Sequence, residues 1–221
     1  MRKRVFAAVA IGLALSTIAG TRFGGWAVVS VGDGPEHFVV GQPTTFDFSV
    51  RQHGETPLDG LSPRITARKG IRWVTGRVVP TPSAGVYRAT IAVPSDGEWA
   101  VTIESGFGPS KGRLLPIRAI AAGERAPVVT PVQRGRQLFA SAGCVTCHVH
   151  GGVDIEPLWD FKAPELTDRR FAADYLAKFL ADPSIKPKSP NVMPMPNPRL
   201  RSSDITALVA FINDERKVVV K

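Results

Sequence analysis

The chain has 221 residues, of which 43% are hydrophobic and 21% charged, a length that suits two small domains. Its 21 glycines and 19 prolines are spread among apolar stretches, which excludes a low-complexity chain. The formal net charge of +9 is diffuse, because Arg2, Lys3 and Arg4 contribute +3 and residues 22–130 and 131–221 contribute +3 each. Because a nucleic-acid-binding surface gathers its basic side chains on one face together with aromatics, we expect no nucleic-acid partner.

Residues 1–24 have the pattern of an export segment. Arg2, Lys3 and Arg4 precede an uncharged apolar run over 5–19. The run is shorter than the roughly 20 residues that a helix needs to span a bilayer, so we favour a cleaved signal peptide. A retained N-terminal anchor, with membrane association through this segment, stays open because apolar residues resume directly after it. Both alternatives predict a periplasmic or otherwise extracytoplasmic protein.

Residues 25–120 carry the pattern of short strands that alternate with turns. Apolar side chains occupy every second position of 44–51 and of 98–104, as they do in half-buried strands. Clusters of Gly, Pro, Asp and Ser separate these segments. Many short strands at this spacing predict an antiparallel β-sandwich.

Gly85-Val-Tyr87, followed by Gly97-Glu-Trp99, resembles the Gly-x-Tyr and Gly-x-Trp pattern of immunoglobulin-like sandwiches in the YtkA/FixH-like group. The resemblance implies an all-β immunoglobulin-like domain, in which we expect Tyr87 and Trp99 to lie in the core. Some members of that group are linked to copper. This segment contains no Met and no Cys, and we read its two histidines as surface or loop residues rather than metal ligands.

Residues 121–131 are predicted to be a linker, because Ala, Gly and Pro dominate and no periodicity holds. They lead into a second domain over 132–221. Thr130, which precedes a proline, is predicted to cap the first helix of that domain. Apolar residues at helical spacing predict two further helices, over 171–181 and 202–212, and therefore an all-α domain.

The two cysteines of the chain lie together in Cys144-Val-Thr-Cys147-His148. Two cysteines at this spacing also fit a redox dithiol or half of a zinc site. The histidine that follows at once, and the lack of any other cysteine, favour covalent attachment of one haem c. Cys144 and Cys147 would then form the thioethers, and His148 would be the proximal iron ligand.

The segment 135–143, Gly-Arg-Gln-Leu-Phe-Ala-Ser-Ala-Gly, resembles the helix that opens class I (mono-haem) c-type cytochromes. The resemblance extends over about residues 131–215 and implies the class I cytochrome c fold. Ala163-Pro-Glu-Leu166 resembles the Gly-Pro-x-Leu step of that family, with Ala163 in place of the glycine. In the family, the proline carbonyl accepts the Nδ1 hydrogen of the proximal histidine, a role that the resemblance gives to Pro164.

The family takes its distal iron ligand from a Met-Pro step, and both Met193 and Met195 precede a proline. Proline restricts the residue before it to extended geometry. Family members commonly have an apolar residue five positions after the ligand, which is Leu200 for Met195 but Pro198 for Met193. We therefore favour Met195 and keep Met193 as the alternative. His150 is a weaker rival, because it lies too close in sequence to the proximal histidine to cross to the other haem face.

A haem with both axial positions filled by protein offers no open site for a substrate, and an axial methionine raises the reduction potential. The resemblance therefore implies an electron-transfer protein rather than an enzyme, cycling between Fe(II) and Fe(III). The expected donor is a quinol-oxidising complex or a dehydrogenase, and the expected acceptor an oxidase or a reductase. We expect the β-domain to serve docking or assembly. A haem ligand-binding sensor and a cytochrome subunit of a larger redox enzyme remain the alternatives.

Overall fold

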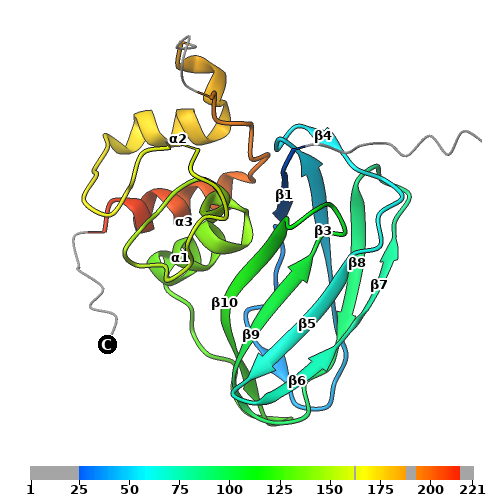
Figure 1. The fold of residues 1–221 in the computed structure, drawn as a ribbon. Helices are drawn as coiled ribbons and strands as arrows, with labels where there is room; N and C mark the ends of the chain where they lie inside the picture. Colours follow the sequence, from blue (N-terminus) through cyan, green and yellow to red (C-terminus); the bar gives the residue numbers. More distant parts are fainter. Residues whose placement is uncertain (1–24, 162, 188–192, 215–221) are drawn as a thin grey trace, which may run out of the picture.

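The computed structural model describes residues 25–161, 163–187 and 193–214. The expected export segment, residues 1–24, lies outside the described residues, and so does the chain after residue 214. The described chain has a β-rich N-terminal region followed by a helical C-terminal region (Figure 1).

The β-rich region consists of two five-stranded sheets that enclose a common hydrophobic core (Figure 1). In the first sheet the order is β1-β3-β8-β7, with the short β4 paired to β3, and in the second it is β2-β10-β9-β5-β6. Neighbouring strands are antiparallel, except that β2 runs parallel to β10. The strands are β1 (Ala27–Ser30), β2 (Phe38–Val39), β3 (Thr44–Gln52), β4 (Thr56–Pro57), β5 (Arg64–Lys69), β6 (Arg72–Thr75), β7 (Arg77–Pro80), β8 (Val86–Ile91), β9 (Gly97–Glu104) and β10 (Lys111–Ile120).

The core of the two sheets contains the two aromatic residues that the sequence placed there. Trp99 is fully buried, and its indole N–H donates to the carbonyl oxygen of Ser95 at 2.9 Å. The buried Tyr87 hydroxyl donates to the Leu58 carbonyl oxygen at 2.7 Å and accepts from the Leu61 N–H at 3.2 Å. Both of these polar groups are thus hydrogen-bonded, as a packed core requires, and the predicted core positions of Tyr87 and Trp99 are confirmed.

The helical region begins at the predicted cap. The Thr130 side chain accepts from the Gln133 N–H at 3.2 Å, and the Gln133 side chain accepts from the Thr130 N–H at 2.9 Å, which together form a capping box. Within the described part of the chain, no helix has both the length and the apolar character needed to cross a membrane. The helical elements are α1 (Pro131–Ser141), η1 (Cys144–Thr146), α2 (Ala173–Ala181), η2 (Pro183–Ile185) and α3 (Ser202–Ile212).

The second predicted helix starts later than the sequence indicated, at Ala173 rather than at Phe171. The backbone of Phe171 is held by Asn213, which directly follows α3. Its N–H donates to Asn213 Oδ1 at 3.0 Å, and its carbonyl oxygen accepts from Asn213 Nδ2 at 2.9 Å. This tertiary contact satisfies the backbone N–H and carbonyl oxygen of Phe171 outside the helix. Helix α2 is therefore shorter than its apolar pattern predicts.

Helices α1 and α3 approach each other at Gly135. A Cβ atom built at this position would clash with the carbonyl oxygen of Ala207 and would lie 2.6 Å from both the Ala207 carbonyl carbon and Phe211 Cβ. Only glycine permits so close an approach between the two helices. Next to it, the rings of Phe139 and Phe211 pack edge to face with centroids 5.8 Å apart.

The β-rich region joins the helical core through strand β10. The pairing of β10 with β9 shifts its register between Leu114 and Ile117. Such a bulge re-aims side chains, and Leu115 belongs to the hydrophobic core of the helical region rather than to that of the sheets. The two regions are therefore packed against each other and are not joined by the linker alone.

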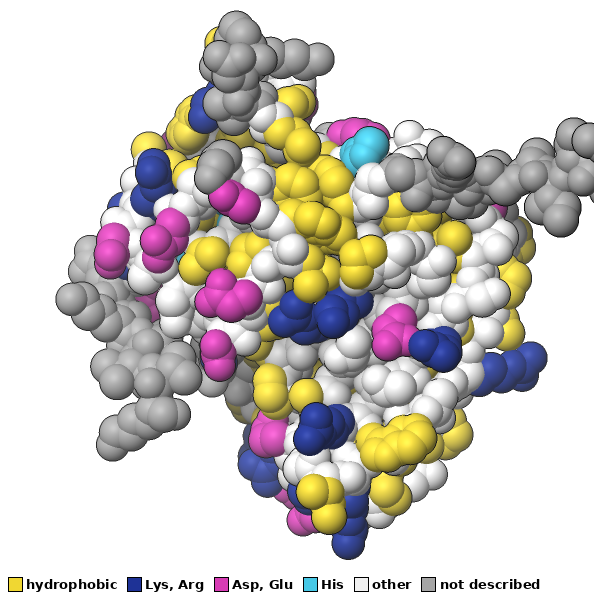
Figure 2. Space-filling model, in the orientation of Figure 1, with side chains coloured by type: hydrophobic (Ala, Val, Ile, Leu, Met, Phe, Trp, Pro, Cys, Tyr) yellow, Lys and Arg dark blue, Asp and Glu magenta, His cyan; other side chains and the backbone are white. Residues whose placement is uncertain are grey.

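Hydrogen bonds strengthen this junction on the other side of α1. The Val31 N–H donates to the Ser141 carbonyl oxygen at 2.7 Å, and the Ser30 hydroxyl donates to the Ala142 carbonyl oxygen at 2.9 Å. Strand β1 thereby lies directly beside the end of α1, as seen in Figure 1. Hydrophobic side chains gather over the boundary between the two regions in the space-filling view of Figure 2.

Candidate haem-binding site

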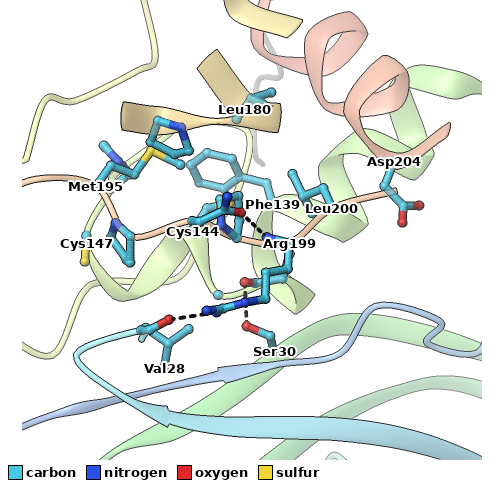
Figure 3. Close-up of a pocket in the computed structure, with 18 of the residues that line it drawn as sticks. Val28, Ser30, Phe139, Cys144, Cys147, Leu180, Met195, Arg199, Leu200 and Asp204 are labelled. Atoms are coloured by element: carbon cyan, nitrogen blue, oxygen red, sulfur yellow. Dashed lines mark hydrogen bonds between the residues drawn. The ribbon is translucent and has the colours of Figure 1, made fainter. Parts of the chain in front are cut away.

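A cavity of about 1140 Å³ lies between the helical region and the outer face of the first sheet. Helix α1 contributes Phe139, and Leu200 comes from the segment before α3 (Figure 3). Helix α2 contributes Leu176, Phe179 and Leu180. The cavity walls are thus built from the amphipathic faces of the helices.

The Cys-x-x-Cys-His segment opens onto this cavity. Gly143 has a φ of +88° and ends α1, after which Cys144 begins the short helix η1. The N–H groups of Cys147 and His148 both donate to the Cys144 carbonyl oxygen, at 3.1 and 2.9 Å. This tight turn brings both thiols and the imidazole to the same cavity.

The two thiols do not have the electrostatic environment of a reactive dithiol. Burial raises the pKa of the Cys144 thiol to about 12 and that of the Cys147 thiol to about 11. Redox dithiols have a lowered pKa that favours the thiolate. Across the ranges that the structure describes, no group of three or more His, Cys, Asp and Glu side chains is arranged to hold a metal ion. The raised thiol pKa values weigh against the redox dithiol.

His148 is held in one ring orientation. Its Nδ1 lies 2.9 Å from the Pro164 carbonyl oxygen, the partner that the family resemblance implied. Since a carbonyl only accepts, Nδ1 carries the hydrogen and Nε2 is left as the lone-pair atom of the ring. Burial lowers the pKa of His148, although the bond to Pro164 acts in the opposite direction. The imidazole is therefore neutral, the form that binds a metal.

The loop that carries Pro164 is fixed to the segment around His148 despite Ala163 standing where the family has glycine. The Leu166 N–H donates to the Val149 carbonyl oxygen at 2.9 Å. The Gly151 N–H donates to the Thr167 hydroxyl at 2.8 Å.

Both candidate methionines line the cavity, but they differ in burial. Met195 is half-buried and packs against the helical core together with Leu200. The Met193 side chain is 50% exposed, and residues 188–192 before it lie outside the described residues. Figure 3 shows Met195 together with Cys144 and Cys147 among the residues that line the cavity.

His150, the weaker rival ligand, is not among the residues that line the cavity. It is buried with its ring centroid 4.3 Å from that of Phe211 and 5.6 Å from that of Phe139. Its Nδ1 accepts from the Gly152 N–H at 3.0 Å. Its place is in the hydrophobic core behind the cavity.

The sequence patterns do not predict that residues of the first sheet line the cavity. Val28 and Ser30 of β1 and Ser49 and Arg51 of β3 line it from the outer face of the first sheet. In the sequence, these residues alternate with the buried residues of half-buried strands. Such alternate positions normally face water. Burial and the nearby Arg199 lower the pKa of Arg51.

Several cationic side chains also line the cavity. An apolar interior with a basic margin and with thiol, imidazole and thioether donors fits haem c, which has an apolar ring, two vinyl groups, an iron and two carboxylates. The cations are Arg51, Arg88, Arg169, Lys186, Arg199 and Arg201.

The model of the cytochrome c family matches residues 132–214, which supports a class I c-type cytochrome in the helical region. The family implies a covalently bound haem c and electron transfer rather than catalysis. A comparison with curated proteins gives no match.

Three similar solved structures are each under 25% identical to this chain. The Lin-41 filamin domain is 17% identical with a TM-score of 0.33, covering 42% of this chain and 91% of that one. Domains 4 and 5 of the S-layer protein SbsC are 21% identical with a TM-score of 0.32, covering 43% and 51%. The ZirS C-terminal domain is 14% identical with a TM-score of 0.32, covering 54% and 86%. These TM-scores are too low to carry an argument.

Proposed function

We propose that this protein is an exported electron carrier with one covalently bound haem c. The observation that carries the proposal is the convergence of Cys144, Cys147, His148 and Met195 on one apolar cavity, within the segment that matches the cytochrome c family. When bound, haem supplies a one-electron Fe(III)/Fe(II) couple.

In this proposal, each side chain has one task. Cys144 and Cys147 form the thioethers, and His148 is the proximal ligand, with Pro164 holding its Nδ1 hydrogen. Met195 is the distal ligand, and its thioether favours a relatively high reduction potential. With both axial positions filled by the chain, the residues leave no site for a substrate, so electrons pass through the haem edge to partner proteins.

The finer parts of the proposal concern the remaining chain. We take the β-rich region as an immunoglobulin-like sandwich related to the YtkA/FixH-like group, serving docking or assembly. Cytochrome c domains are typically extracytoplasmic, which agrees with an export signal over 1–24 and a periplasmic location. The partners would be a quinol-oxidising complex or dehydrogenase as donor, and an oxidase or reductase as acceptor.

The assignment of the distal ligand is tested with Met195→Ala and its matched control Met193→Ala. We expect Met195→Ala to lower the reduction potential, to remove the long-wavelength charge-transfer band of methionine-ligated ferric haem, and to let the ferrous form bind CO. Met193→Ala should leave all three unchanged, because that side chain is half exposed. Reversed effects would make Met193 the ligand. Ready CO binding by the unaltered protein would instead favour the ligand-binding sensor.

A further inference from the structure

The turn that joins β3 to β4 is a tight hairpin on the cavity side of the first sheet. The Glu55 N–H donates to the Gln52 carbonyl oxygen at 3.0 Å, and His53 and Gly54 both have positive φ, at +53° and +76°. Because Gln52 pairs with Thr56, the loop of this hairpin consists of the three residues His53, Gly54 and Glu55. The His53 N–H is also bonded to the Trp26 carbonyl oxygen at 3.0 Å. These hydrogen bonds hold the turn in place, so that another segment can pack against it.

The segment that follows Met195 packs against this turn. A Cβ atom built at Gly54 would lie 2.6 Å from Pro196 Cγ and 2.7 Å from Pro196 Cβ. The backbone of Gly54 thus presses directly on the ring of the residue next to Met195. In Figure 1, the orange segment before α3 accordingly runs past β4 and β1.

Polar contacts fix the same segment to Glu55. The Asn197 N–H donates to Glu55 Oε1 at 3.2 Å. Arg199 reaches back to the turn, with Nη1 donating to the Gly54 carbonyl oxygen at 3.4 Å and Nη2 lying 3.5 Å from Glu55 Oε2. Figure 3 shows the Arg199 side chain extending away from the Met195 segment toward the sheet.

The backbone of the segment is strained at the point where it is held. Arg199 has a φ of +52°, a left-handed conformation that is unfavourable for a residue with a long side chain. Strain of this kind persists only where surrounding contacts over-determine the conformation. Here those contacts are the turn on one side and, on the other, Asn197 Oδ1, which accepts from the Arg199 N–H at 2.8 Å.

We propose that the turn His53–Glu55 positions Met195 as the distal iron ligand, so that the β-rich region sets the reduction potential of the haem. This inference rests on the proposed function. The residues of the turn do not touch the iron; they hold Pro196 and Asn197, and through them the backbone that aims the thioether. The β-rich region then acts as one wall of the redox site, beyond any service as a docking module.

The test uses the full-length holoprotein with substitutions in the turn. Gly54→Ala pushes a methyl group into Pro196, and Glu55→Ala removes the acceptor of the Asn197 N–H, whereas Glu55→Gln keeps an acceptor oxygen. Gly41→Ala is the matched control for the first change, because Gly41 has a φ of +74° and a Cβ there would meet no atom within 4 Å. Glu98→Ala, at an exposed position of the other sheet, is the control for the second.

Three quantities are measured: the methionine charge-transfer band, the reduction potential, and hydrogen exchange at the Asn197 amide. We expect Gly54→Ala and Glu55→Ala to weaken or abolish the band, to lower the potential and to speed exchange. Glu55→Gln should restore most of the band and the potential, and both controls should match the unaltered protein.

The outcomes separate this inference from the function on which it rests. An unaltered protein that has the band, together with turn variants whose band and potential do not change, would overturn the positioning role alone. An unaltered protein with no covalent haem or no methionine band would overturn the proposed function and this inference together. If Gly54→Ala fails to fold, the comparison of Glu55→Ala, Glu55→Gln and Glu98→Ala still decides the question.

Discussion

The two regions of the molecule bury their apolar residues in different ways. The sheets enclose a continuous core around Trp99, and each sheet supplies one wall of it. The helices are only 11, 9 and 11 residues long, and part of their apolar surface faces the cavity of about 1140 Å³. Because helices this short are marginal in isolation, we expect the helical region to depend on its packing against the β-rich region and on what fills the cavity, whereas the core of the sheets is closed by the sheets themselves.

The outer face of the first sheet connects the two kinds of packing. It closes the cavity with Val28 and Arg51. In the second sheet, the bulge in β10 places Leu115 in the helical core. The cavity of the helical region therefore depends on the β-rich region for one of its walls. The predictions below test how far this dependence extends.

The largest effect is expected from Cys144→Ala combined with Cys147→Ala. The variant should retain no haem on a denaturing gel, because both thioethers are lost. Hydrogen exchange should accelerate throughout α1 and α3 but not in β3 and β9, because the core of the sheets does not include the cavity. Haem that still migrates with the denatured chain would refute the thioether assignment. Equal acceleration in both regions would contradict the independence of the sheets.

Gly135→Ala should destabilise the helical region by about 2–3 kcal/mol, since the added methyl group overpacks the contact between α1 and α3. The measurement is the free energy of opening from hydrogen exchange in those two helices. Gly41→Ala, which adds a methyl group in open space on the sheet side, serves as the comparison. An unchanged opening free energy would mean that α1 and α3 lie further apart than described here.

Thr130→Ala removes the capping box at the start of α1 and should cost about 1 kcal/mol of helical stability. Thr130→Ser keeps the oxygen that accepts from the Gln133 N–H, and we expect nearly unchanged stability for it. The two variants are compared by denaturant unfolding followed through the haem absorbance. A similar loss in both would assign the effect to the lost methyl group rather than to the cap.

The smallest expected effect is the pH dependence of the stability of the sheets. The Arg88 guanidinium, bonded to Asp47 at 2.7 and 2.8 Å, holds the pKa of that carboxyl below its ordinary value of 3.8. Since the unfolded chain then binds the proton more readily than the folded one, the pair stabilises the sheets above pH 3.8 and loses this effect as the pH falls through the lowered value. The pair is exposed to solvent, so we expect only a small effect on stability.

Comparing the unfolding of the unaltered protein with that of Asp47→Asn, near neutral pH and at acidic pH, checks this prediction. The difference should be largest near neutral pH and should vanish in acid. A difference that grows in acid would mean that the sign is wrong.

Much of the candidate site follows from local sequence. The cap at Thr130, the close approach at Gly135 and the Cys-x-x-Cys-His turn each depend on residues within one or two helical turns, or on a family pattern that places them. The start of α2 was predicted two residues early because Phe171 is held by Asn213, some forty positions away. Short-range periodicity carries no information about such a contact.

The sequence by itself determined that this chain has a β-rich region and a helical region, and it supplied the candidate ligands for haem c. Only the tertiary structure decided that the sheets close the haem cavity and that Gly54 and Glu55 hold the segment after Met195. In the sequence, these two residues are indistinguishable from any hairpin turn. Their significance comes from packing against Pro196 and Asn197, more than 140 positions later, and such long-range contacts are fixed by the burial of whole surfaces rather than by local preference.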